Sequence, residues 1–308
     1  MRVATYTQGS LTALPLVLAE QLGYFKQEGL AVDVEEMASG AKASQALVGG
    51  SADVASAFYE LTLQMAAQGR NLISFVNLAR YPGYVLMGSP ASASKVHRVE
   101  DLKNSMVAIS SPGSPTDQFL KYVLIHHGLP ADAASTVAAG SNAARVAILE
   151  HGGVAAAVLS DPAASQFLKR HPNTTMLADV RNSAGVRQLF STDTYVSAVL
   201  TSSAQWLQRN PDSAHRIARA MNRSLDWMQH HTLEEIAKQT PEKLKGSDAA
   251  VFAEALRASF SSFPPDGRFE SGGINAVRKV LTATDPQAKL ASLDLAKTYT
   301  NEFVTADK

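Results

Sequence analysis

The sequence contains no cysteine. This absence excludes disulfide frameworks, thiolate metal sites and cysteine nucleophiles. The net charge is zero, because 28 Lys and Arg residues balance 28 Asp and Glu residues. The chain therefore lacks the excess positive charge that is typical of proteins that bind nucleic acid. Apolar runs are interrupted by Gly, Ser or charged residues well before the roughly 20 residues that a membrane helix requires. We therefore expect no nucleic-acid partner and no membrane span.

Signatures of catalysis are missing as well. The sequence has no G-x-S-x-G, no Walker loop, no G-x-G-x-x-G and no H-E-x-x-H. Its two histidine pairs, His126-His127 and His230-His231, are adjacent in sequence and would point to different faces of a helix. We therefore expect no catalytic residue, no metal and no cofactor, and we predict that the protein is not an enzyme.

A repeated segment indicates the organisation of the chain. Residues 38–57 and 139–157 each read as a Gly/Ser turn, a helix, a Gly-Gly pair and a short strand of small and β-branched residues. The chain has 308 residues, which exceeds the size at which one core usually stays undivided. The repeat therefore predicts two similar α/β lobes with a cleft between them, and clefts of this kind bind ligands.

Strands that alternate with helices predict a mainly parallel sheet flanked by helices in each lobe. We place a first crossing between lobes near Arg80 to Pro90 and a return crossing near Thr194 to Leu200. The predicted first lobe comprises residues 1–84 and 198–308, and the second comprises residues 85–197. From Ser203 onward the pattern is helical. We expect this tail to pack on the first lobe, although a separate helical domain is the alternative.

Four junctions between a strand and a helix carry the candidate ligand residues. At the carboxyl edge of a parallel sheet, free helix N–H groups and small hydroxyl residues can approach a ligand, which suits a small anion or a polar headgroup. Any one junction could equally be an ordinary N-cap, so the argument depends on their convergence. The junctions contain Gln8 and Ser10, Ser39 and Gly40, Ala57 and Phe58, and Ser114 and Thr116.

Other side chains near the expected cleft add candidates. Tyr195 and Phe58 could hold an organic ligand by stacking, and Arg80 could meet an acid group as a bidentate donor. A core position for the rings and a solvated charge at the rim for Arg80 are the alternatives. Glu60 and Asp161 would instead favour an amine, unless helix N-termini neutralise them.

These features together resemble the periplasmic solute-binding proteins of ABC importers, in particular the group that binds nitrate, sulfonates, taurine and the pyrimidine precursor of thiamine. The resemblance is carried by residues 18–30, which end in Gly-Tyr-Phe-Lys-Gln-Glu-Gly-Leu, by Ser39-Gly40, by residues 48–55 and 99–103, and by Asp161-Pro162. It implies a type II periplasmic-binding-protein fold with two crossover strands. It also implies ligand contacts at the junction residues above and at Asp161.

The resemblance further implies how such a protein works. It would act as a monomer in the periplasm, after removal of a leader peptide, and deliver a small organic or oxo-anion nutrient to an ABC permease. Ser160 precedes Asp161-Pro162, where members that bind sulfonates often have an aromatic residue, so a sulfonate is not singled out. The alternatives are a binding protein for the pyrimidine precursor, an enzyme of the menaquinone-pathway or pyrimidine-synthase type on the same fold, and a sensor domain.

Overall fold

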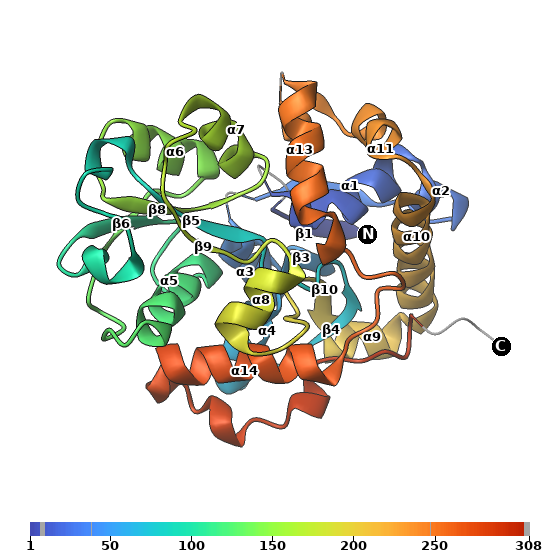
Figure 1. Ribbon diagram of the computed structural model, residues 1–308. Coiled ribbons are helices and arrows are strands. Elements are labelled where there is room, and N and C mark those ends of the chain that lie inside the picture. The colour runs from blue at the N-terminus through green and yellow to red at the C-terminus, as the bar shows by residue number, and fades with distance from the viewer. Residues whose placement is uncertain (7–9, 38, 247, 305–308) are drawn as a thin grey trace.

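The computed structural model describes residues 1–6, 10–37, 39–246 and 248–304. These residues form two five-stranded sheets. The first sheet has the order β2 (Asp33–Glu36), β1 (Arg2–Thr5), β3 (Val54–Phe58), β10 (Ala198–Ser203) and β4 (Leu72–Asn77). The second has the order β7 (Ser135–Ala138), β6 (Met106–Ile109), β8 (Ala156–Ser160), β5 (Tyr84–Gly88) and β9 (Met176–Asp179). Each sheet lies in its own half of the molecule (Figure 1).

The two sheets have the same topology, position by position. In each, three neighbouring strands are parallel, and the fourth strand, β10 or β5, pairs antiparallel with both of its neighbours. The fourth strand is the one that follows a crossing, so it enters its sheet from the opposite direction. The sheets are therefore mixed. Fewer of their strands pair in parallel than the sequence pattern predicts. The repeated segments occupy equivalent places, as α3 (Gly40–Val48) with β3 and as α6 (Asn142–Glu150) with β8.

Helices flank both sheets. Around the first sheet the chain also forms α1 (Leu14–Gln21), α2 (Tyr24–Gln27) and α4 (Tyr59–Ala67). Around the second it forms α5 (Pro115–His126), α7 (Ala163–Arg170) and α8 (Ser183–Phe190). Strands β5 and β8 are buried along their whole length, as expected where helices cover both faces of a sheet. Short 3-10 turns lie at Leu11–Ala13, Pro90–Ser92 and Val99–Leu102.

Two segments connect the halves and run side by side. The first, residues 78–83, leads from β4 to β5, and the second, residues 191–197, leads from α8 to β10. Their backbones are joined by bonds from Tyr195 N to Arg80 O and from Ser197 N to Ala79 O, both 2.8 Å. The return segment is irregular up to Ser197, and its strand begins at Ala198, later than the sequence pattern predicts. Tyr84 is already part of the second sheet.

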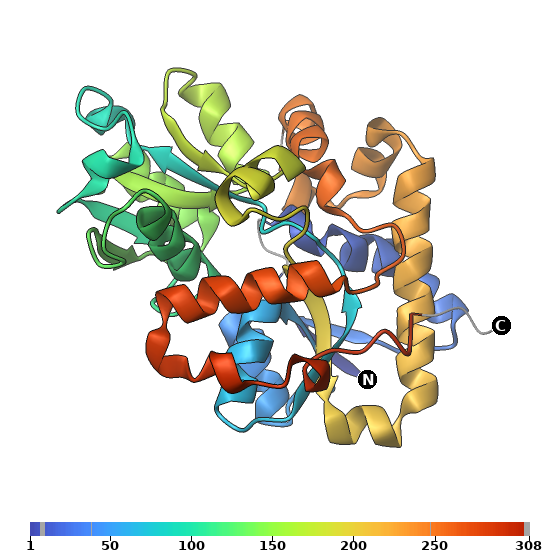
Figure 2. The same ribbon diagram turned by 60° about the horizontal axis from the view of Figure 1, so that its bottom comes forward.

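The C-terminal third is helical, as predicted, and it contacts both halves. It comprises α9 (Ala204–Arg209), α10 (Pro211–His230), α11 (Leu233–Gln239), α12 (Glu242–Lys245), α13 (Ala249–Ser259) and α14 (Ser271–Thr284), with 3-10 turns at Phe260–Ser262, Pro286–Ala288, Leu290–Ser292 and Leu295–Lys297. Helix α10 packs on α1 of the first half. The tail also reaches the second half, because α13 packs on α7 and α14 packs on α5 (Figure 2).

Candidate functional site

A pocket lies between the two halves, at the ends of their central strands. It holds about 460 Å³ of space free of protein atoms, part of it open to solvent. Both halves contribute to its wall. The first half supplies Tyr6, Ser10, Ser39, Gly40, Ala41 and Phe58, and the second supplies Tyr84, Ser110, Ser111, Ser114, Pro115, Thr116, Asn142, Arg145 and Ser160.

Helix α5 brings a cluster of hydroxyl groups to the pocket. Ser114 is the N-cap of this helix, and its Oγ accepts a bond from the backbone N–H of Asp117. The Oγ atoms of Ser110 and Ser114 and the Oγ1 of Thr116 lie 2.9 Å from one another. Because Pro115 holds the first helical position, the turn is preorganised. The cluster offers several polar contacts to a small headgroup.

Arg145 places a positive charge in the pocket wall. It lies on α6 and is only 3% exposed. Its guanidinium donates to the carbonyl oxygen of Gly140 and, over 2.6 Å, to Asn142 Oδ1, while its Nε is buried without a hydrogen-bond partner. Burial lowers the pKa of Arg145. No acidic residue is present among the described residues that line the pocket, so this charge has no carboxylate counterpart there.

Three aromatic side chains complete the wall. The rings of Phe58 and Tyr84 lie 6.3 Å apart at a tilt of 46°. Burial raises the pKa of Tyr6, and it raises that of Tyr84 far more, with a further contribution from Glu60, so both phenols stay protonated and can donate. Gly40 leaves room for the ring of Phe58, because a Cβ at position 40 would lie only 3.0 Å from that ring. The pocket thus combines donors with apolar ring surface.

The candidates taken from the sequence divide into three groups. Lining the pocket are Ser10, Ser39, Gly40, Phe58, Ser114 and Thr116. Gln8 lies outside the described residues. The remaining four, Ala57, Arg80, Asp161 and Tyr195, are absent from the lining.

Arg80 and Ala57 are the first two of these four, and each contacts other parts of the protein outside the pocket. Arg80 donates from Nε to the carbonyl oxygen of Ser261 over 3.0 Å, and its guanidinium lies over the ring of Tyr81. Ala57 is a buried residue of β3 that pairs with Val199 of β10. Both positions are therefore occupied by contacts within the protein.

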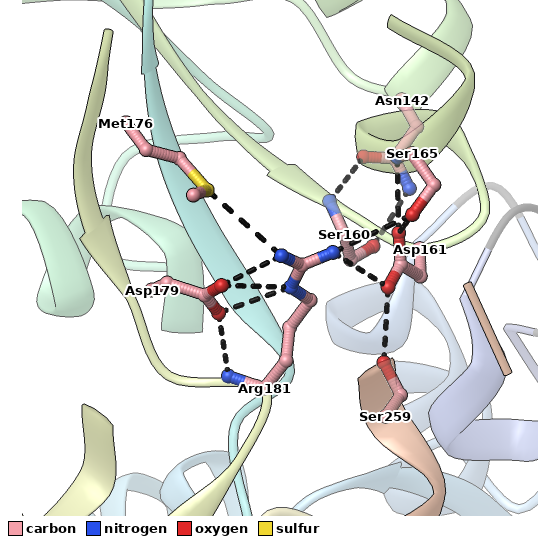
Figure 3. A network of polar contacts seen from close by, with 8 residues as sticks. All are labelled: Asn142, Ser160, Asp161, Ser165, Met176, Asp179, Arg181 and Ser259. Carbon is pink, nitrogen blue, oxygen red and sulfur yellow. Dashed lines mark hydrogen bonds and ion pairs between the residues drawn. The ribbon is translucent and has the colours of Figure 1, made fainter. Parts of the chain in front are cut away.

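Asp161 is the centre of a buried polar network (Figure 3). Its Oδ1 accepts from the hydroxyl of Ser165 over 2.8 Å, and its Oδ2 accepts from Arg181 Nη1 over 3.1 Å and from the hydroxyl of Ser259 over 3.0 Å. Arg181 also pairs with Asp179, with 2.6 Å between Nη2 and Oδ2. These bonds use both carboxylate oxygens of Asp161.

Tyr195 and Glu60 form a buried pair beside the crossings. The hydroxyl of Tyr195 donates to Glu60 Oε1 over 2.9 Å, whereas Glu60 Oε2 is buried without a partner. Burial raises the pKa of Glu60 to about 7. Glu60 does not line the pocket, so both carboxyl groups that the sequence analysis placed near the expected cleft, Glu60 and Asp161, are absent from its lining.

Asn142, Arg145 and Ser160 are site residues that the sequence reasoning missed. Asn142 and Arg145 lie in the second copy of the repeat, on the same helix face as the buried Val146 and Leu149. The signal available in the sequence was Arg145, a charged residue on the helix face that carries the apolar Val146 and Leu149. Asn142 Nδ2 donates to Ser160 Oγ over 2.8 Å, and Asn142 Oδ1 accepts from Ser160 N over 3.1 Å, which joins α6 to the end of β8.

Two kinds of feature are absent from the described part of the chain. It contains no group of three or more His, Asp or Glu side chains placed to hold a metal ion. None of its helices combines the length and the apolar composition needed to cross a bilayer.

Comparison with solved structures agrees with this architecture. A protein from Bordetella bronchiseptica RB50 superposes with a TM-score of 0.90 at 32% identity, covering 98% of this chain and 95% of its own. The alkanesulfonate-binding protein SsuA of Xanthomonas axonopodis pv. citri, bound to MOPS, gives 0.76 at 20% identity, with 97% of each chain covered. The periplasmic nitrate-binding protein NrtA of Synechocystis PCC 6803 gives 0.75 at 17% identity, covering 98% of this chain and 86% of its own.

The two-lobed type II periplasmic-binding-protein fold expected from the sequence is thereby confirmed. The family model described as NMT1/THI5 like matches residues 11–235. This match spans well over half of the 308 residues, and the chain therefore belongs to the NMT1/THI5-like family.

Proposed function

We propose that the protein is a solute-binding protein that captures a small organic anion or oxo-anion for an ABC importer. The observation that carries the proposal is the buried guanidinium of Arg145 in a pocket whose described lining residues include no acidic side chain. Burying a charge without a counterion is costly. A bound anion would offset that cost, which gives the pocket a preference for negative charge.

The uncharged groups support the same class of solute. The phenol hydroxyls of Tyr6 and Tyr84, which burial keeps protonated, line the pocket and can donate to an anion. The hydroxyls of Ser110, Ser114 and Thr116 add further donors beside the N-terminus of α5. The rings of Phe58 and Tyr84 suit a compact apolar part. A carboxylate, a sulfonate or nitrate meets these requirements.

Both halves of the molecule would contact such a solute. The second half supplies the charge and most hydroxyls, and the first supplies Tyr6, Ser39 and Phe58. A ligand that touches both halves stabilises the closed arrangement by its differential affinity for it. We propose that the protein works as a monomer in the periplasm and that its closed form docks on a permease. The proposed lobes are residues 1–83 with 198–308 and residues 84–197, one residue earlier than the sequence predicts, because Tyr84 pairs within the second sheet.

Thermal shift and calorimetry test this function. We expect methanesulfonate, taurine, nitrate or benzoate to raise the Tm, with a Kd around micromolar or tighter, about −8 kcal/mol. Arg145→Gln should weaken binding by about 10- to 100-fold, because it removes a charge-assisted contact. Arg187→Gln is the matched control, since Arg187 is exposed and pairs with Asp193. Stabilisation only by a neutral pyrimidine, or by none of these compounds, would contradict the proposal.

A further inference from the structure

The two contacts between the C-terminal helices and the second half differ in kind. At the first, α14 and α5 share one buried apolar cluster, which also includes residues of the two crossings. Thr284 of α14 donates a hydrogen bond to Gln118 of α5 inside this contact. Gly273 of α14 packs on the return crossing, because a Cβ there would lie 3.1 Å from Val196 N. Separating α14 from α5 would expose this apolar surface to water, which is unfavourable.

At the second contact, between α7 and α13, the described residues of the two helices belong to different apolar clusters. Phe252, Ala255 and Leu256 of α13 cluster with α1 and α10, whereas Ala164 and Phe167 of α7 cluster with the second sheet. Polar side chains of the two halves pair at both ends of α13. Lys169 and Asp248 form an exposed ion pair of 2.7 Å. The seam also contains a groove open to solvent, lined on one side by residues of α6 and α7 and on the other by Lys243, Leu244 and Gly246.

Asp161 makes the buried polar contacts of this seam. Its side chain accepts from Ser259 at the end of α13, and its backbone oxygen accepts from Leu11 N over 3.0 Å. Ser259 and Leu11 belong to the first half, while Asp161 follows β8 of the second. Arg181 and Ser165 hold the carboxylate from within the second half (Figure 3). For the halves to part here, the bonds from Ser259 and Leu11 to Asp161 must break, together with the exposed Lys169–Asp248 ion pair.

We infer that the molecule opens at the seam between α7 and α13, with Asp161 as the latch that holds it shut, while α14, α5 and the crossings form the pivot. Polar contacts can be exchanged for water at small net cost, whereas the apolar contact at α14 resists separation. The latch lies beside the pocket, because Ser160, its neighbour in sequence, lines the wall. This inference rests on the proposed function only in taking that pocket as the site that closure covers.

Distances between spin labels test the latch without any solute. Because the chain has no cysteine, the pair Arg170→Cys with Ala250→Cys would report on the seam, and the pair His126→Cys with Thr282→Cys on the pivot. Pulsed electron–electron double resonance would measure the distance between the two labels of each pair in the parent, in Ser259→Ala and in Ser165→Ala. The two serine variants are matched, since each removes one hydroxyl bound to Asp161, but only Ser259 lies across the seam.

We expect Ser259→Ala to shift the closed-to-open ratio about tenfold, seen as a longer distance between labels 170 and 250. The distance between labels 126 and 282 should not change, and Ser165→Ala should behave as the parent. Lys169→Met, at an exposed site, should shift the seam in the same direction by less. The latch is refuted if the pivot pair lengthens instead, or if Ser259→Ala and Ser165→Ala give the same distributions. Neither outcome would affect the Arg145 dependence of anion binding, which tests the function separately.

Discussion

The hydroxyl of Tyr195 lies 2.9 Å from Glu60 Oε1 and joins the return crossing to the first turn of α4. Both residues are buried, with Glu60 2% exposed and Tyr195 2% exposed. The second carboxyl oxygen of Glu60 has no partner. A buried carboxyl group in this state favours its neutral form, so the crossing is attached to the first half through a group that titrates near neutral pH.

The stability of the protein should therefore fall as the pH rises from about 4.5 to about 7. Burial raises the pKa of Glu60 from 4.5 to about 7 in the folded protein, so in that range the folded state binds a proton that the unfolded state has released. The stabilisation is complete below the unfolded value and is lost as the pH passes the folded value. The total change is about 3 kcal/mol.

Urea unfolding of Glu60→Gln at pH 5 and pH 8 measures this effect. We expect the variant to gain stability relative to the parent on going from pH 5 to pH 8, because an amide does not ionise. Glu254→Gln, on the exposed side of α13, should show no such gain. Equal differences from the parent at the two pH values would argue against a neutral Glu60.

Gly40→Ala should weaken solute binding while the fold is retained. The new methyl group would lie 3.0 Å from Phe58 Cδ2, so the ring must shift, and both residues line the pocket. The backbone of Gly40 is helical, and alanine is favoured there, so the Tm of the solute-free protein should not fall. Calorimetry with the anion that binds the parent should give a Kd raised by about tenfold. An unchanged Kd would mean that the ring does not contact the solute.

Arg181→Met should destabilise the protein by about 3–5 kcal/mol, because it leaves the buried carboxylate of Asp161 and the partly buried one of Asp179 without their cation. The side chain of Arg181 is 8% exposed and pairs with both Asp161 and Asp179. Arg187→Met removes an arginine whose side chain is 64% exposed and pairs only at the surface. It should cost less than about 1 kcal/mol. Chemical denaturation of both variants gives the comparison, and similar losses would show that burial of the network is unimportant.

Gly185→Ala should be among the more damaging single substitutions. A Cβ at this position, in α8, would overlap the carbonyl oxygen of Asp179, so β9 or α8 must move. We expect a loss of more than about 3 kcal/mol in the free energy of unfolding. Gly272→Ala, near the start of α14, meets nothing closer than 3.7 Å and should be neutral or slightly stabilising. A mild effect at Gly185 would indicate that the turn before α8 can relax.

The sequence supports the two-lobed architecture because its main signals are local. Ser39 and Ser141 each cap the helix of one repeat copy, with the hydroxyl accepting from the backbone N–H three residues later. Local signals of this kind do not predict that β5 and β10 run antiparallel to their neighbours. The pattern of a strand does not depend on the direction in which it enters a sheet, so only the crossings decide it. Strand β9 has one exposed and three partly buried residues and none that is fully buried, so it left no clear pattern and was not predicted.

The candidate site was predictable at its hydroxyl junctions, because the carboxyl ends of parallel strands converge. Ser10, Ser39, Ser114 and Thr116 reach the pocket for that reason. The role of Asp161 depends on Arg181 and Ser259, which lie 20 and 98 residues away along the chain. No spacing rule links such distant positions. Arg145 was visible in the repeat, but its burial becomes clear only when α6 is packed against the second sheet.

The three hydroxyls at the start of α5 have a consequence for selectivity. Between Thr116 and each of the two serines, either oxygen can be the donor. Rotation of these O–H bonds can therefore present a proton or a lone pair to whatever lies opposite, without movement of any heavy atom. Such a lining adapts to headgroups of different shape. We therefore expect the protein to bind several related acids rather than a single compound.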